Sequence, residues 1–305
     1  MSNDEEIYFS PYRVSTITCN ANIGENINLD LKILFENILI IDKDDAESGI
    51  VWVQYMREGE ELSRGVYPKK RRKSKKNKMK KNRFDNQVTI IFKNNTYMPN
   101  VKIFKNGNIQ LTGIKNISDT EVIVNHIIHN IYNIYDNISK DIISNREDNY
   151  KLNLKYQNFK IRMINSDFKV YCDSDLKVGF GLKRREIHKL FISDLYNNKC
   201  SFQPGIYQGV KLEYFWNRCN NDKNGLCTCP KKCYGKGKGE NINECKKVTG
   251  ALFESGSILI TGGVSFEQVD ETYKYICEFL KKHKDLIKKI QPSAMKMNNE
   301  VQVAC

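Results

Sequence analysis

The chain has 305 residues and a formal charge of +13 at pH 7, enough for one large domain or two small ones with a packed core. No stretch approaches the roughly 20 apolar residues of a membrane-spanning helix, and residues 1–7 are acidic and polar, unlike a secretory signal. We therefore expect a soluble, intracellular protein whose ten cysteines are reduced thiols and not a disulfide framework.

The predicted elements come in the same order in both halves of the chain. The first half opens with a strand at 12–18, followed by a short helix at 29–38, several strands and a long helix at 119–143. The corresponding strand, short helix and long helix of the second half are expected at 159–165, 184–196 and 266–290.

An insertion, about residues 47–85, follows the first short helix. Within it, Ile50–Tyr55 is predicted to be an added strand, and Lys69–Arg83 holds eleven Lys or Arg and no acidic residue. Subtracting these 11 charges from 13 leaves about +2 for the rest of the chain, so the basicity is local. Such a run has no apolar periodicity and repels itself, so we expect disorder there. It could bind phosphates, act as a nuclear localisation signal or be a solvated loop without a specific role.

An internal repeat pairs Ile103–Gly113 with Leu252–Gly262, with Phe, Gly, Ile, Thr and Gly recurring at a constant offset of 149 residues. Each copy has the pattern of a strand, a tight Asn-Gly or Ser-Gly turn and a second strand, which is a β-hairpin. A capping-box pattern follows each copy, at Ser118 and Ser265, and begins an amphipathic helix. The apolar stripes of these helices comprise Val122, Ile127, Ile128, Ile131 and Ile134, and then Val269, Tyr273, Ile276, Phe279 and Leu280.

The element order predicts an α+β fold, with an antiparallel sheet that carries helices on one face and leaves the other face open. Two halves related by a pseudo-twofold axis would present an open surface with the symmetry of a duplex minor groove. No nucleophile elbow, P-loop or HExxH motif is present in the sequence, so an enzyme is not expected.

The ordered set of motifs resembles the TATA-box-binding protein family, in a divergent form, over about residues 12–145 and 156–285. The stretches that carry the resemblance are Val14–Thr16, Leu29–Lys32, Gln87–Gly113, Phe159–Ile161, Ser201–Pro204 and Leu252–Gly262. The resemblance implies a two-repeat saddle, one continuous curved antiparallel sheet with helices on the convex face. It divides the chain into a tail at 1–11, a first repeat at 12–145, a linker at 146–155, a second repeat at 156–290 and a tail at 291–305.

The family bends DNA by wedging aromatic side chains between base steps of the minor groove, and it is a standard example of that mechanism. Carried over by position, three of the four wedge positions hold rings: Phe104, Phe253 and Tyr207. The fourth is Gln87, for which Phe84 would substitute if the insertion shifts the register. Core packing is the alternative for a Phe at a strand end. Strand alternation argues against it, because Phe104 shares its face with the charged Lys102.

The minor groove presents mainly hydrogen-bond acceptors, so hydroxyl, amide and apolar side chains suffice to read it. On the resemblance and the strand parity, groove contacts are expected from Thr112, Thr261, Val14, Asn165, Leu259 and Gln110. Phosphate contacts are expected from Lys93, Lys115 and Lys102. The family's paired asparagines are replaced by Tyr12 and Met163, and the second-repeat counterparts of Lys93 and Lys115 are Glu213 and Val264, so DNA binding should be weaker than in a typical member.

A second insertion, about Asn217–Lys246, is rich in Gly, Lys and Asn, which cannot build a core. Its cysteines are Cys219, Cys227, Cys229, Cys233 and Cys245. Five thiols in 27 residues suit a four-thiolate zinc site. The spacing lacks paired C-x2-C knuckles, so a cysteine-rich loop without metal stays an equal alternative. No other cofactor is expected.

The predicted function is that of a general transcription initiation factor that binds and bends double-stranded AT-rich DNA in the minor groove. Its expected partners are other initiation factors and RNA polymerase, with no membrane and no small-molecule substrate, and its expected location is the nucleus or a viral transcription site in the cytoplasm. The family's acidic factor-binding positions are Gln203 and Gly205 here, which puts that one contact in doubt. The alternative is a scaffold of the same fold that recruits polymerase or factors and binds DNA weakly or without sequence preference.

Overall fold

The computed structural model describes residues 6–44, 47–57, 60–68, 86–144 and 153–289. The chain forms two compact units. The first-repeat unit is Thr16–Arg162, and the second-repeat unit combines Met1–Ser15 with Met163–Cys305. Among the described residues, no helix combines the length and apolar character that crossing a membrane requires. The basic run Lys69–Arg83 and the candidate wedge residue Phe84 lie outside the described residues.

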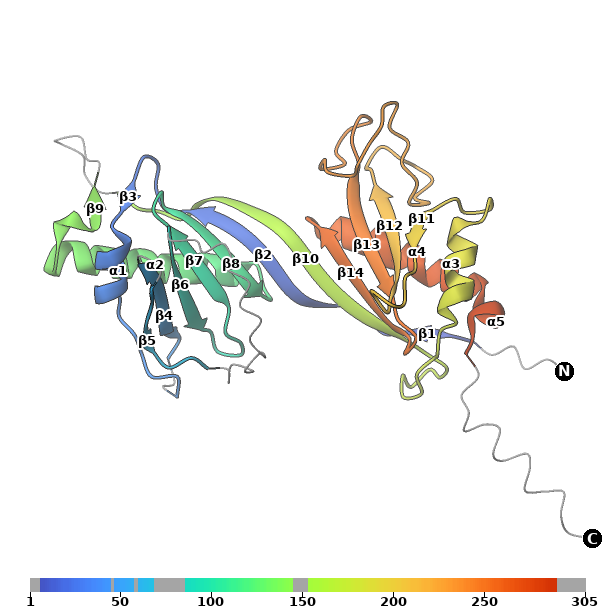
Figure 1. Ribbon diagram of the computed structural model, residues 1–305, viewed down its shortest axis with the longest axis horizontal. Coiled ribbons are helices and arrows are strands. Elements are labelled where there is room, and N and C mark those ends of the chain that lie inside the picture. The colour runs from blue at the N-terminus through green and yellow to red at the C-terminus, as the bar shows by residue number, and fades with distance from the viewer. Residues whose placement is uncertain (1–5, 45–46, 58–59, 69–85, 145–152, 290–305) are drawn as a thin grey trace, which may run out of the picture. The chain divides into compact units, whose positions relative to one another are not determined.

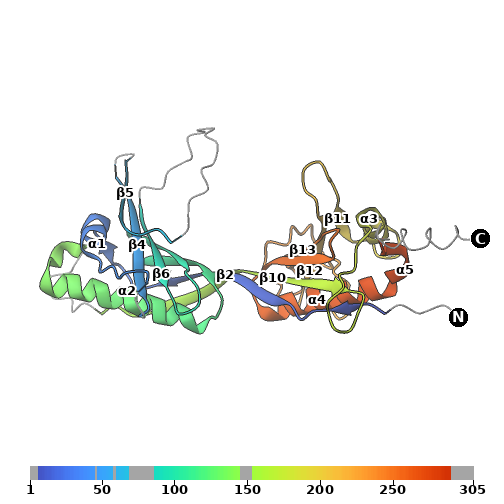
Figure 2. The same cartoon turned by 90° about the horizontal axis from the view of Figure 1, so that it is seen from below.

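The first-repeat unit is an antiparallel sheet covered by helices on one face (Figures 1 and 2). Its main elements are β2 (Arg13–Asn22), α1 (Leu31–Asn37), β4 (Gly49–Arg57), β5 (Glu60–Gly65), β6 (Gln87–Lys93), β7 (Asn100–Phe104), β8 (Asn108–Ile114) and α2 (Ser118–Asn137). The strand order is β2-β8-β7-β6-β4-β5. A short ribbon of β3 (Asn28–Leu29) and β9 (Ile143–Ser144) lies beside it, with a 3-10 turn at Lys140–Ile142.

Alternation along the strands decides which face is covered. In β7, Val101 and Ile103 are fully buried under the helices, whereas Lys102 and Phe104 on the opposite face are half-buried. Helix α2 presents a nearly continuous apolar stripe to the sheet: Ile123, Val124, Ile127, Ile128, Ile131 and Ile134 are all buried. Val122, expected in that stripe, is 62% exposed, so this assignment was wrong. It lies one residue before the buried face, a rotation of about 100° around the helix.

The second-repeat unit repeats this plan. Its elements are β1 (Tyr8–Phe9), β10 (Gln157–Tyr171), α3 (Arg184–Ile192), β11 (Lys199–Ser201), β12 (Val210–Trp216), β13 (Lys246–Leu252), β14 (Ser257–Gly263), α4 (Phe266–Lys282) and α5 (Lys284–Ile287). The strand order is β11-β12-β13-β14-β10. Phe191 of α3 stacks on Phe279 of α4 at a ring-centroid distance of 3.9 Å, which joins the two helices over the covered face.

Residues from the start of the chain complete the second-repeat unit. Strand β1 pairs with β10, with Phe9 opposite Val170. The hydroxyl of Tyr273 in α4 donates to the carbonyl of Ser10 at 3.1 Å, and Ile7 is buried. The first strands are therefore structural parts of the unit that the end of the chain builds.

The predicted fold class is confirmed, because the described residues form a 12-stranded sheet together with few helices. The strand expected at Ile50–Tyr55 is present as β4, but it is no addition to the repeat. It pairs with β6 as β11 pairs with β12. The extra strand is β5, which the sequence reading missed because its six residues, EELSRG, show no apolar alternation.

The two capping boxes behave differently. Ser265 caps α4, and its hydroxyl accepts from the Gln268 amide at 3.3 Å. Ser118 lies inside α2, and the cap residue Ile117 has no side-chain cap bond among the described residues. The prediction at Ser118 was therefore wrong. The long helices are also shorter than expected, because α2 ends at Asn137 and α4 at Lys282.

Candidate nucleic-acid interface

We call the helix-free face of each unit's sheet its open face. On the open face of the first-repeat unit, the ring of Phe104 borders a solvent-open hollow of about 1110 Å³. Three exposed cations, Lys105, Lys160 and Arg162, line it, and no carboxylate does so among the described residues. Side-chain amides line it as well, from Asn20, Asn22, Asn86, Asn106, Asn108, Gln110 and Asn158. The hollow is therefore cationic and rich in amide donors.

Strand register gathers polar groups into rows across this open face. Thr89 pairs with Lys102, Lys102 with Gln110, and Gln110 with Asn20, so four neighbouring strands each contribute one polar side chain. Asn100, Thr112 and Thr18 form the next row. The side-chain oxygen of Asn20 is buried without a hydrogen-bond partner in the described part of the chain.

On the open face of the second-repeat unit, two rings form a pair. Tyr207 and Phe253 lie 5.7 Å apart between ring centroids in an edge-to-face arrangement, and both are half-buried. The ammonium of Lys211 lies 4.1 Å from the centroid of Tyr207. The pair thus combines an apolar surface with one adjacent cation.

Gly209 makes room for this pair. Val210 pairs with Leu252, so continuing the register by one residue places Gly209 opposite Phe253. A Cβ atom on Gly209 would come within 2.8 Å of the Tyr207 ring and 3.1 Å of the Phe253 ring. In the first-repeat unit the residue opposite Phe104 is Gln87, and no second ring is described there. The two units therefore present one ring pair and one single ring.

Two of the groove candidates of this unit, Leu259 and Thr261, line a hollow of about 380 Å³. Thr249, Tyr207 and Lys211 line it as well. Val14 is half-buried, and the side-chain oxygen of Asn165 is buried without a partner among the described residues.

A carboxylate also stands in this hollow. Glu213 forms ion pairs of 3.0 Å with both Lys199 and Lys247. Burial alone would raise the pKa of Glu213, but these two lysines outweigh it and lower the pKa, so the group is charged at neutral pH. Two cations of this open face are therefore already partly neutralised.

Several sequence expectations need correction. The counterpart of Lys93 in the second repeat is Phe215 and not Glu213, because Val88 and Val210 occupy equivalent register positions. Tyr12 does not take the place of a groove-facing asparagine, since its ring packs edge-on against Tyr273 of α4 at 5.4 Å.

The predicted phosphate ligands differ in their surroundings. Lys102 lies on the open face next to Phe104, while the ammonium of Lys115 lies 5.7 Å from the ring centroid of Tyr97. Lys93 ends β6 and is half-buried. The sequence reading missed Lys160 and Arg162, which alternate along β10 and could have been found from the period of two in that strand.

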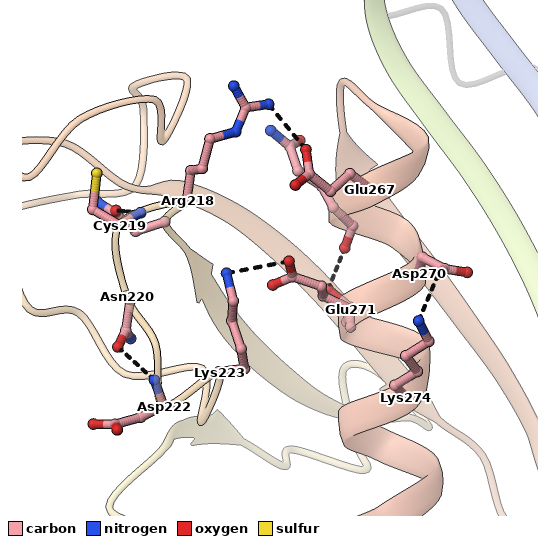
Figure 3. A network of polar contacts seen from close by, with 12 residues as sticks. Arg218, Cys219, Asn220, Asp222, Lys223, Glu267, Asp270, Glu271 and Lys274 are labelled. Carbon is pink, nitrogen blue, oxygen red and sulfur yellow. Dashed lines mark hydrogen bonds and ion pairs between the residues drawn. The ribbon is translucent and has the colours of Figure 1, made fainter.

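Four of the five predicted thiol ligands come together. The sulfur atoms of Cys227, Cys229, Cys233 and Cys245 all lie within 4.8 Å of one another, so this group could hold a metal ion. Cys219 is exposed and lies outside the group. It sits instead beside the contacts that hold the insertion against α4 (Figure 3).

Comparison with known proteins agrees with the resemblance. No protein-family model matches the chain. The chain is 29% identical over 291 residues, 90% of its own length, to a "TATA-box-binding protein-like" protein of Acanthamoeba polyphaga mimivirus, and it spans 66% of that protein. Among solved structures it is similar to Methanococcus jannaschii TBP, with a TM-score of 0.45 and 14% identity over 90% of this chain and 99% of that chain. The curated relative confirms the resemblance to the TATA-box-binding protein family.

Proposed function

Starting from the chain's similarity to a TATA-box-binding protein-like protein, we propose that it binds and bends double-stranded AT-rich DNA in the minor groove and acts in transcription initiation. One observation carries this proposal. Each unit has an open face on which an aromatic ring at the end of a hairpin strand stands beside amide, hydroxyl and cationic side chains. Other initiation factors and RNA polymerase are the proposed protein partners, in the nucleus or at a viral transcription site. The protein is not an enzyme in this proposal.

The ring pair supplies the wedge. Tyr207 and Phe253 present a combined apolar edge that can enter an opened base step, and Lys211 beside Tyr207 can meet the phosphate that flanks the step. Opening a step costs a few kcal/mol, which the larger contact with bent DNA offsets. Phe104 opens the corresponding step for the first-repeat unit as a single ring.

The polar rows supply the groove contacts. Amide N–H groups of Asn20 and Gln110 and the hydroxyls of Thr112 and Thr261 can donate to adenine N3 and thymine O2. Leu259 and Val14 contact the floor of the groove without accepting a hydrogen bond. A guanine amino group facing them would be left unpaired, so AT pairs are favoured.

Cations around Phe104 supply sequence-independent affinity. Lys102, Lys105, Lys160 and Arg162 lie on or beside the same open face, where each phosphate they neutralise releases counterions. The second-repeat unit contributes less, because Glu213 engages Lys199 and Lys247.

The second candidate function is a scaffold that keeps the fold and recruits polymerase or factors while binding DNA weakly. Two observations favour it: Gln87 faces Phe104 where a second ring would complete a wedge, and Glu213 places a negative charge in the groove-reading hollow of the other unit. Such a protein would associate with DNA without a sharp bend and without preferring AT-rich sequence.

Bending separates the two candidates. A short AT-rich duplex labelled at both ends should show increased energy transfer when the full chain binds, because the bend brings the ends together. Phe253→Ala and Phe104→Ala should each reduce that increase by more than half. Phe266→Ala is the matched control, since Phe266 is a 40% exposed ring at the start of α4 on the helix side. No change in transfer at saturating wild-type protein would reject bending and favour the scaffold.

A further inference from the structure

The insertion between β12 and β13 folds into a defined structure. Trp216, the last residue of β12, is fully buried, and Gly239 of the insertion packs against its indole. The side chain of Asn217 donates to the carbonyls of Asn241 and Glu244 at 2.8 and 2.6 Å, which ties the start of the insertion to its end.

Side chains of helix α4 bind the insertion through ion pairs and a hydrogen bond. Arg218 forms an ion pair with Glu267 at 3.0 Å, and Lys223 forms one with Glu271 at 3.2 Å (Figure 3). Within the insertion, Arg218 also pairs with Glu240 at 2.6 Å. The side-chain amide of Gln268 also donates to the Lys238 carbonyl at 3.1 Å. These contacts hold residues 218–223 and 238–240, two separate parts of the insertion, close to the start of α4.

The cysteines converge at the centre of this structure. The Sγ atom of Cys245, immediately before β13, lies 3.4 Å from that of Cys229 and 3.7 Å from that of Cys227. These distances exceed the roughly 2.05 Å of a disulfide bond. They are close to the edge of about 3.8 Å that a tetrahedron has when its centre lies 2.3 Å from each sulfur, the usual zinc–thiolate length.

A supporting hydrogen bond is also in place. The Gly235 amide donates to the Sγ atom of Cys233 at 3.3 Å, as backbone amides do toward metal-bound thiolates. Gly235 adopts a positive φ of 67°, and a Cβ there would come within 2.5 Å of Lys247. The glycine therefore allows the turn that aims its amide at the sulfur.

The geometry points to a structural zinc site formed by Cys227, Cys229, Cys233 and Cys245. Because Cys245 immediately precedes β13, the metal would link the middle of the insertion to the start of that strand. Binding one Zn²⁺ forms four Zn–S bonds and releases the four thiol protons to solvent, without any oxidant or reductant. The remaining insertion cysteine, Cys219, takes no part. This inference does not depend on DNA binding.

Elemental analysis of the full chain, purified with a reductant and without a strong chelator, should find one zinc per chain. Cys229→Ser and Cys233→Ser should each lower that value to below one fifth. Cys219→Ser is the matched control, because this thiol lies in the same insertion outside the cluster, and it should leave the zinc content unchanged. Less than half an equivalent in the wild type, or iron with visible absorbance, would overturn the assignment.

A second measurement on the wild type guards against variants that fail to fold. Thiol alkylation mapped by mass spectrometry should label Cys219 readily and leave Cys227, Cys229 and Cys233 protected. Removing zinc with a chelator should then expose those three. Cobalt exchange should give the thiolate charge-transfer bands of a tetrahedral four-sulfur site. Equal labelling of Cys219 and Cys227 before chelation, or a disulfide between cluster cysteines, would reject the site.

Discussion

At the scale of single residues, the second-repeat open face depends on an absent side chain. Gly209 is the residue over which Tyr207 and Phe253 meet, and the two rings occupy the space in which its Cβ would lie. Tyr207 is two residues before the register position opposite Phe253, so its ring has to lean over the glycine to reach its partner. The position of each ring therefore depends on the other ring and on the absence of a side chain at Gly209.

We predict that Gly209→Ala displaces the ring pair. Its Cβ would lie 2.8 Å from Tyr207 and 3.1 Å from Phe253, an overlap that would cost about 1–3 kcal/mol if the rings were held in a packed core. Because the rings are half-exposed, they should move outward and leave the melting temperature nearly unchanged, while end-to-end energy transfer in bound DNA falls. Gly205→Ala is the control, since nothing lies within 4 Å of its Cβ position. Equal bending by wild type and Gly209→Ala would show that the pair is not the wedge.

Some of the residues on the open faces could be predicted from the sequence and others could not. Strand alternation and the repeat were sufficient to predict the face of the sheet on which Phe104 and Phe253 lie, because that face follows from local periodicity. The roles of Gly209 and Glu213 could not be predicted, because each depends on the cross-strand register of β12 and β13, two strands separated by a 29-residue insertion. Register is set by the pairing of the two strands, and the long insertion between them leaves the length of the connection without information on that pairing.

At the scale of elements, the two long helices show that equivalent sequence patterns need not make equivalent caps. Ser265 caps α4, whereas Ser118 is the first residue inside α2. In the latter case Asp119 accepts hydrogen bonds from Tyr97 and Asn116, which engages the start of the helix with the β6–β7 turn. The sequence predicted the helices but not which neighbouring residues would form hydrogen bonds with their first turns.

We therefore expect Ser265→Ala to lower the free energy of unfolding by about 1 kcal/mol, the usual value of a side-chain N-cap. Ser118→Ala should change it by less than about 0.5 kcal/mol, because no cap bond is lost and alanine favours helix. Urea denaturation followed by circular dichroism measures both. Similar losses for the two variants would contradict the difference in capping.

At the scale of the whole molecule, charge is divided unevenly along the chain. Lys69–Arg83 carries eleven of the thirteen net positive charges, while the open faces combine Lys160 and Arg162 in one unit with the neutralising Glu213 in the other. If the folded faces read the groove and the basic run contributes only charge, the two contributions should separate experimentally.

Replacing residues 69–83 with an uncharged segment of equal length should weaken DNA binding and flatten its salt dependence. The slope of log affinity against log salt should shrink by nearly one unit for each lost phosphate contact. Preference for AT-rich over GC-rich duplex should persist, because base reading does not use that segment. Fluorescence anisotropy over a salt series tests this. An unchanged slope would assign the run to nuclear import or partner binding.

The pairing of β1 with β10 has a consequence for how the chain folds during synthesis. Residues 16–162 are contiguous and can fold as soon as they leave the ribosome. The hydrogen bond between Ser10 and Tyr273, in contrast, joins residues 263 positions apart. Joining such distant segments is slow, and an unpaired strand edge left exposed in the meantime invites association with other chains. Strand β1 can therefore pair with β10 only after residue 171 has been translated, and its contact with α4 forms only once Tyr273 has followed.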